Sequence, residues 1–260
     1  MVKLYNSLIF RLNKFKYFIL FHILKLKIIN TVSHNGINIK FLITNEITDY
    51  RAKSFAYKEP KTLKWIDSFE NNKCFWDIGS NVGVYSIYSK LINNSLNVIS
   101  FEPSFKNLNI LSENLKLNKI SKEITVFSLP ISNTQSINDF ILGDDVDGGA
   151  NSSLYPVNYN EKLYQNSYRT MSISIDTLIT SFNLPRPYYI KIDVDGNEMN
   201  ILKGINNYYN DIKEILVEVD NYKTNLNYLE KFLNNKNFFI SDIETFDVNN
   251  NTANILFKRQ

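Results

Sequence analysis

Polar residues with the spacing of a nucleotide-binding turn follow an apolar segment at residues 75–83, which read FWDIGSNVG. Asp77 ends the predicted strand, and Gly79, Asn81 and Gly83 form the turn that leads into a helix. Nucleoside-containing cofactors bind at such strand ends in α/β sheets. A dinucleotide fingerprint needs three glycines spaced G-x-G-x-x-G, and this turn lacks that spacing. The acid and the two glycines favour S-adenosylmethionine, which has no phosphate to cradle.

A second acid lies at the position where the ribose of a nucleoside-containing cofactor would bind. Glu102 follows the predicted strand Asn97–Phe101, roughly 20 residues beyond the glycine turn, where an acid accepts hydrogen bonds from ribose hydroxyls. The structural alternative is that Asp77 and Glu102 only cap the helices after them, which contributes about 0.3–1 kcal/mol without any ligand. The ordered pair favours the cofactor interpretation.

Carboxylates gather again at a later strand, because residues 189–196 read YIKIDVDG. Asp193 lies at the predicted strand tip, where it could orient an acceptor hydroxyl or take its proton. Asp195 is the second catalytic candidate, although its spacing to Glu198 is that of a capping box with a helix beginning just after Asp195.

A metal-assisted version of the same site stays open, because Glu218 and Asp220 follow the next predicted strand and carboxylates bind divalent ions. The only two histidines, His22 and His34, lie outside the predicted core. A histidine base or a histidine-rich metal centre is therefore disfavoured, and we expect no metal.

Alternating strands and helices predict a doubly wound α/β domain. The expected parallel strands are Cys74–Ile78, Asn97–Phe101, Ile124–Ser128, Tyr188–Ile192, Ile215–Val219 and Phe238–Asp242, followed by an antiparallel Asn254–Phe257. The expected helices include Val84–Ile92, Phe105–Leu117, Glu198–Ile205 and Tyr222–Leu233. Another helix is expected from Pro60 to Phe69, and Gly36–Ile43 alternates like an edge strand. Residues 129–169 interrupt this rhythm as a polar insertion, which we interpret as a substrate lid over the cofactor.

Charge is spread unevenly along the 260 residues, whose net charge is +3. Seven lysines and arginines and no acid fall within residues 1–45, so the remainder is mildly acidic. Nucleic-acid enzymes rely on a basic groove that neutralises phosphates, and this distribution disfavours a nucleic-acid partner.

Two units follow from these patterns: a basic amphipathic helix over residues 1–35 and a catalytic domain over 36–260. The longest uncharged apolar run of the helix, Tyr17–Leu24, is too short to span a bilayer, which takes about 20 residues. Peripheral contact of residues 1–30 with the inner membrane face is one interpretation. Packing on the domain or on a second copy in a homo-oligomer is the other, and a cytoplasmic location is expected.

The motifs taken together resemble the FkbM family of methyltransferases over about residues 50–245. The resemblance rests on FWDIGSNVGVYS, ISFEPS, the ISN of residues 131–133, YIKIDVDGNEMNILKG and LVEVD. It implies a Rossmann-like class I enzyme that transfers the methyl group of S-adenosylmethionine to an oxygen, commonly a hydroxyl of a sugar or another small molecule. The departure from the family pattern is Asn197, where many members carry histidine.

Site residues are carried over from the family by matching positions. The resemblance implies that Asp77, Gly79, Asn81 and Gly83 bind the methionine end of the cofactor, that Glu102 binds its ribose, and that Ser132 and Asn133 edge its adenine. The alternatives are a nucleotide-binding oxidoreductase, which the missing glycine disfavours, and a domain that binds cofactor without chemistry.

Overall fold

The computed structural model describes residues 27–154, 166–245 and 252–260. Within them, seven strands form one sheet in the order β10, β11, β9, β8, β3, β4, β5. Their bounds are Phe238–Thr245 (β10), Ala253–Arg259 (β11), Glu214–Val219 (β9), Tyr189–Ile192 (β8), Cys74–Ile78 (β3), Asn97–Phe101 (β4) and Ile124–Phe127 (β5). The last strand, β11, runs antiparallel to both of its neighbours, and strands β9 to β5 run parallel. The predicted seven-stranded, mostly parallel sheet is confirmed.

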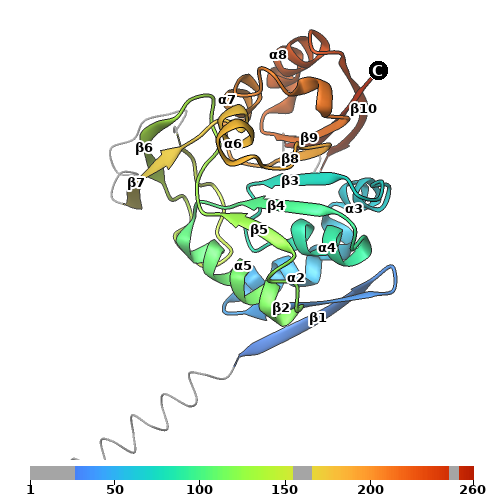
Figure 1. The fold of residues 1–260 in the computed structure, drawn as a ribbon. Helices are drawn as coiled ribbons and strands as arrows, with labels where there is room; N and C mark the ends of the chain where they lie inside the picture. Colours follow the sequence, from blue (N-terminus) through green and yellow to red (C-terminus); the bar gives the residue numbers. More distant parts are fainter. Residues whose placement is uncertain (1–26, 155–165, 246–251) are drawn as a thin grey trace, which may run out of the picture.

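Helices cover both faces of this sheet (Figure 1). One face packs against α6 (Ile175–Phe182), α7 (Glu198–Lys203) and α8 (Tyr222–Asn234), and the other against α2 (Glu46–Lys58), α3 (Pro60–Asp67), α4 (Val84–Ile92) and α5 (Phe105–Leu117). Side chains alternate between the two cores, since Trp76 and Ile78 of β3 face the first and Phe75 faces the second. The domain is therefore doubly wound, as the alternation of elements predicted.

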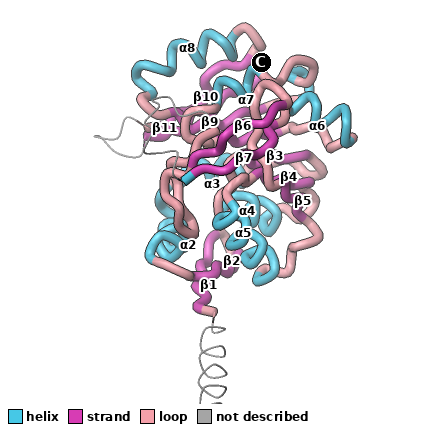
Figure 2. The backbone as a smooth tube through the Cα atoms, turned by 90° about the vertical axis from the view of Figure 1, so that its left-hand side faces the viewer, coloured by secondary structure: helices cyan, strands magenta, loops and turns pink. Residues whose placement is uncertain are grey.

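The predicted N-terminal helix is wrong over residues 28–34. Ile28–His34 forms strand β1, which pairs antiparallel with β2 (Ile37–Ile43) in a separate two-stranded sheet (Figure 2). Asn35 and Gly36 connect them with φ of 47° and 77°, and Asn-Gly is the dipeptide that a tight hairpin turn favours. Residues 37–43 are thus not an edge of the main sheet, and residues 1–26 of the predicted helix lie outside the described part of the chain.

The hairpin is joined to α5 by asparagine side chains. Asn114 Oδ1 accepts a hydrogen bond of 2.7 Å from the N–H of Leu42, and Asn118 bonds both the N–H and the carbonyl of Lys40. These bonds satisfy backbone groups of β2 that a partner strand would otherwise take. Among residues 27–154, 166–245 and 252–260, no helix is long and apolar enough to span a bilayer.

The insertion between β5 and β8 contains more regular structure than the sequence indicated. Strands β6 (Ser136–Ile141) and β7 (Ser167–Ser172) pair antiparallel at one side of the main sheet (Figure 1), and α6 follows them. The sequence predicted one possible strand here, over Asp139–Leu142, which overlaps β6, and it missed β7, α6 and α2. Residues 155–165, the middle of the predicted lid, lie outside the described residues, but residues 143–154 contact the sheet end.

Candidate active site

A cavity lies across the carboxyl ends of five neighbouring strands. It encloses about 860 Å³ including its open mouth, within the range of small-molecule sites. Its wall takes Gly79 and Asn81 from the loop after β3, Glu102 from β4, residues 129–131 from β5, Asp193 and Asp195 from β8, and Glu218 from β9. The strand order reverses at β3, and this switch point is where α/β sheets bind ligands.

Gly79 brings the turn after β3 close to the neighbouring strand. Its φ is +83°, and a Cβ atom there would lie 1.8 Å from the carbonyl oxygen of Asp193. Gly83 begins α4 with φ +86°, and a side chain would meet Leu111 at 2.2 Å. Both positions require glycine, because they combine left-handed backbone with close approach. Gly79 lines the cavity, whereas Gly83 does not and serves helix packing.

Glu102 holds the turn in shape from the next strand. Its carboxylate accepts hydrogen bonds of 2.7 Å from the N–H of Asn81 and 2.8 Å from that of Ser104. Burial raises the pKa of Glu102 to about 7, although these two N–H groups and Asn107 oppose the shift. The residue therefore holds the turn after β3 and the N-cap residue of α5 through their N–H groups, and it also lines the cavity.

Asp77 lies behind the turn and does not reach the cavity wall. Its Oδ2 accepts a 2.5 Å hydrogen bond from the Ser86 hydroxyl, which in turn accepts one of 2.7 Å from Ser100. Its buried Oδ1 has no hydrogen-bond partner among the described residues. Burial raises the pKa of Asp77. Asp77 thus ties α4 to β3 and β4, while Asn81 presents its own side chain to the cavity.

Ser132 and Asn133 lie outside the cavity wall, which is formed at this point by Leu129, Pro130 and Ile131. Ser132 is fully buried, and its N–H donates to the carbonyl of Ile173 across an isolated bridge. Asn133 is exposed on the far side. The segment that the family motif marks is therefore adjacent to the site, but the structure does not bring these two side chains into it.

Asp193 faces the cavity together with a buried lysine partner. Lys191 Nζ lies 2.5 Å from Asp193 Oδ2, and its side chain is only 2% exposed. Burial alone would raise the pKa of Asp193, but the Lys191 ammonium, with Lys58 and Arg51, holds it below its ordinary value. The carboxylates of Asp193, Glu59 and Asp77 raise the pKa of Lys191, although burial of the ammonium opposes this shift. Asp193 is therefore an ionised acceptor at neutral pH.

Asp195 does not cap α7 as its spacing predicted. The helix begins at Glu198 with Asn197 as its N-cap, because Asp195 (φ 50°) and Gly196 (φ 104°) add a left-handed turn before it. Asp195 Oδ2 instead accepts a 3.1 Å hydrogen bond from the N–H of Ser152 in the insertion. Burial and repulsion from Asp193 raise the pKa of Asp195 to about 6.

Glu218 lines the cavity at the same end as Asp193, and Asp220 does not line it. Burial, with repulsion from Asp193, raises the pKa of Glu218 to about 9, so its carboxyl group is mainly protonated at neutral pH. Asp220 is exposed and accepts a hydrogen bond of 2.6 Å from Thr252. In the described part of the chain, no three His, Cys, Asp or Glu side chains are arranged to hold a metal ion.

Two cations from α2 face the same cavity, and no predicted motif included them. Arg51 and Lys58 line it, and Lys58 Nζ lies 3.2 Å from the buried Glu59. The charges of α2 are mixed along the helix, so no polar motif marks its cavity side. The available signal was the cap, since Asn45 and Thr48 have a helix-start spacing.

The insertion closes over the turn through residues 147–152. The carbonyl of Gly149 accepts hydrogen bonds from Asn81 (2.8 Å) and Asn107 (3.1 Å) side chains, and that of Gly148 accepts one of 2.7 Å from Arg51 Nε. The segment is therefore bonded to α2, to the turn after β3 and to α5. It forms one wall of the cavity, as expected of a segment that covers a ligand.

Comparisons with known proteins agree with this geometry. The family model of the methyltransferase FkbM domain matches residues 77–240. The chain belongs to the FkbM methyltransferase family. It is 24% identical over 71% of its length to the hexuronic acid methyltransferase AglP of Haloferax volcanii, covering 72% of that protein. It is 25% identical over 63% of its length to the methyltransferase sdnD of Sordaria araneosa, covering 73% of it.

A solved FkbM structure has the same fold. The methyltransferase FkbM of Methylobacillus flagellatus superimposes with a TM-score of 0.53 at 15% identity, over 82% of this chain and 52% of the other. FkbM membership confirms the methyltransferase class and its cofactor, S-adenosylmethionine, and it favours this class over an oxidoreductase. Nucleic-acid, membrane and oligomer contacts are untested by these comparisons and stay predictions.

The cavity of this FkbM protein fits that cofactor because its two ends differ in character. The end over β4 and β5 is apolar, with Phe101, Pro103, Leu129, Ile131 and Phe140 in its wall. The end over β8, β9 and α2 is charged, with Arg51, Lys58, Asp193 and Glu218 in its wall. A flat purine would suit the first end and a charged amino acid the second, and Glu102 also lines the cavity.

Asn197, where many FkbM members carry histidine, has a positioning role here. Its buried side chain donates 2.9 Å from Nδ2 to the carbonyl of Ile131 and accepts 2.8 Å at Oδ1 from Asn200. The residue thus fastens the start of α7 to the loop after β5. Both of its polar atoms are engaged, so Asn197 offers no base at this position.

Proposed function

We propose that this chain transfers the methyl group of S-adenosylmethionine to an oxygen atom of a sugar or related acceptor. Family membership supports the methyl transfer, and the relative AglP, a hexuronic acid methyltransferase, supports a sugar acceptor. The single observation that carries the oxygen acceptor is the Asp193–Lys191 pair at the charged end of the cavity. A carboxylate kept ionised beside a cofactor is suited to a hydroxyl.

Asp193 would act on the acceptor itself. When bound, S-adenosylmethionine supplies a methyl group already activated by positive sulfur. A hydroxyl placed against Asp193 would donate its hydrogen bond to the carboxylate and give up its proton there. Its oxygen would take the methyl group, whose bond to sulfur breaks to leave S-adenosylhomocysteine. Lys191 holds the same carboxylate at 2.5 Å and fixes its direction. General-base assistance of this kind is worth about 10²–10⁴ in rate.

The other residues of the site would align and enclose the reactants. Glu102 and the turn at Gly79 fix the cofactor end, and the segment at residues 147–152 limits access of water. Alignment alone supplies up to roughly 7–11 kcal/mol when the reacting atoms are well placed. Asp195, bonded to Ser152 in that segment, would orient the acceptor or the segment.

The test is methyl transfer from labelled S-adenosylmethionine to a panel containing a neutral methyl glycoside, a hexuronate and a polyol, with the methylated atom located by NMR. We expect an ether or ester oxygen to carry the label. Asp193→Asn should lower turnover by about 10²–10⁴ and leave cofactor affinity nearly unchanged.

Four results would count against parts of this proposal. Label on nitrogen or carbon would exclude the oxygen acceptor, and normal turnover of Asp193→Asn would remove Asp193 from the chemistry. Binding of cofactor without transfer to any member of a broad acceptor panel would favour a non-catalytic domain. Loss of activity with chelator and its return with Mg²⁺ would favour a metal-assisted version.

A further inference from the structure

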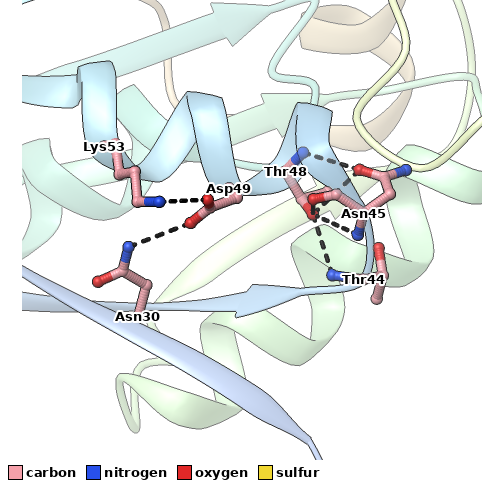
Figure 3. A network of polar contacts seen from close by, with 6 residues as sticks. All are labelled: Asn30, Thr44, Asn45, Thr48, Asp49 and Lys53. Atoms are coloured by element: carbon pink, nitrogen blue, oxygen red, sulfur yellow. Dashed lines mark hydrogen bonds and ion pairs between the residues drawn. The ribbon is translucent and has the colours of Figure 1, made fainter.

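Helix α2 is held firmly at its start, below the cavity. Asn45 and Thr48 form reciprocal cap bonds, of which the one from Thr48 N–H to Asn45 Oδ1 is 2.9 Å (Figure 3). Asp49 joins the same helix to Asn30 of β1, and it pairs with Lys53 at 2.5 Å. Because the cap bonds and the contact with β1 both fix the first turns of α2, a side chain one turn further along the helix has a defined position.

Arg51 is that side chain, and it reaches two connected spaces. It lines the main cavity and also a smaller recess beneath the turn after β3, whose wall includes Gly79, Ser80 and Asp193. Its positive charge lowers the pKa of both Glu102 and Asp193, against the larger effect of burial. Arg51 therefore lies within electrostatic reach of the acids at the tips of β4 and β8, on either side of Gly79.

The donors of Arg51 are only partly engaged. Nε donates 2.7 Å to the carbonyl of Gly148. For the two terminal nitrogens, no hydrogen bond or ion pair is found with the described residues. A planar guanidinium with two parallel donors left over matches the geometry of a carboxylate.

The other cations near the turn have carboxylate partners inside the protein. Lys191 is buried against Asp193 at 2.5 Å, and Lys58 lies 3.2 Å from Glu59. The acids of the wall would repel a carboxylate ligand unless a cation received it. Among the described residues, Arg51 is the cation beside the turn whose terminal N–H groups remain available to a ligand.

We propose that Arg51 binds the carboxylate of the methionine part of S-adenosylmethionine, an inference that rests on the proposed function for the identity of the cofactor. Arg51 is a binding residue in this assignment, with its terminal nitrogens on the ligand and its Nε on the insertion. The family motifs do not include it, because it lies before the first core strand.

Two ligands that differ by one group test this directly. S-adenosylhomocysteine carries the amino-acid carboxylate, and 5′-methylthioadenosine keeps the adenosine and sulfur but lacks the amino acid. Calorimetry on the full chain should show that Arg51→Gln weakens S-adenosylhomocysteine about 10- to 150-fold, the range for a hydrogen-bonded charged group. The affinity for 5′-methylthioadenosine should stay within about twofold, because no carboxylate is present.

Matched variants separate this role from general effects of charge and of the insertion. Lys53→Gln removes a cation from the same helix, but Lys53 is paired with Asp49 and is absent from the cavity wall. Lys106→Gln removes a contact to Asp145 of the insertion without touching the cavity. Both variants should bind S-adenosylhomocysteine as the wild type does, and Arg51→Lys should recover part of the loss.

Each contrary result has a definite meaning. Unchanged binding of S-adenosylhomocysteine by Arg51→Gln overturns the proposal, even if the KM of an acidic acceptor rises. Equal weakening of both ligands also overturns it, because Arg51 would then act through the insertion alone. A wild type that binds S-adenosylhomocysteine but methylates no oxygen would refute the proposed function and leave the role of Arg51 standing.

Discussion

Cofactor binding should depend on pH through Glu102. This carboxyl group is buried, accepts two backbone N–H bonds and has a pKa raised by burial to about 7. If Glu102 accepts hydrogen bonds from the two ribose hydroxyls, as proposed, the bound state favours the carboxylate, which is the stronger acceptor. The free protein is about half protonated at pH 7, and binding must therefore release protons.

The size of the effect follows from that pKa. If the bound state is fully ionised, protonation weakens the apparent affinity by a factor of 1 + 10^(pKa − pH). With a pKa of about 7, the factor is about 11 at pH 6 and about 1.1 at pH 8, so affinity should rise about tenfold across this interval. The direction of this pH dependence is fixed. When the ligand needs the Glu102 anion, binding is stronger at higher pH, where more of the carboxyl group is ionised.

Calorimetry with S-adenosylhomocysteine at pH 6, 7 and 8, in buffers of different ionisation enthalpy, measures both affinity and proton release. The control is Glu102→Gln, which keeps the shape and removes the titration. It should bind more weakly than the wild type at pH 8 and lose the tenfold rise. A flat wild-type affinity from pH 6 to 8 refutes the reasoning. The same slope in Glu102→Gln would assign it to another group, of which Asp195, with a pKa of about 6, is the nearest in range.

Two further variants address the turn and the acceptor end. Gly79→Ala forces a Cβ to 1.8 Å from the Asp193 carbonyl oxygen and should abolish S-adenosylhomocysteine binding. The control is Gly36→Ala, because Gly36 is also at positive φ but has nothing within 4 Å of the added Cβ. This variant should keep binding and lose only about 1–2 kcal/mol of stability in urea unfolding. Lys191→Met removes the ammonium that lowers the pKa of Asp193, so the acidic limb of the pH–rate profile should move to higher pH. The variant should also lose about 3–5 kcal/mol of stability, because the buried carboxylate loses its partner. An unmoved limb would show that ionisation of Asp193 does not limit turnover.

The sheet could be predicted because its signals are local. Each central strand is a short apolar run that ends in a polar or glycine residue, and parallel strands bring those ends to one edge. That is why Gly79, Asn81, Glu102 and Asp193 could be placed together from spacing alone. An antiparallel last strand was also predicted, over Asn254–Phe257, and the structure has it at Ala253–Arg259.

Features fixed by a single backbone angle or a distant contact could not be predicted in the same way. Asp195 has a capping-box spacing to Glu198, but the left-handed pair at residues 195–196 makes Asn197, and not Asp195, the N-cap residue. Ser132 is drawn into the interior by its bond to Ile173 from the insertion. The predicted N-terminal helix extended to residue 35, yet the Asn-Gly turn at residues 35–36 closes a hairpin over residues 28–43.

Arg51 shows why part of a site can be invisible in sequence. Its helix packs through Ala52 and Phe55 into the core shared with the hairpin, and that packing alone decides which side chain of α2 faces the cavity. The cavity therefore combines two kinds of contribution. The sheet positions the acids at the strand ends, and sequence motifs predict them. Tertiary packing of the helix positions the cations of α2, and no motif predicts them. Because the cofactor carries charges of both signs, a site with only the motif residues would lack a partner for its carboxylate.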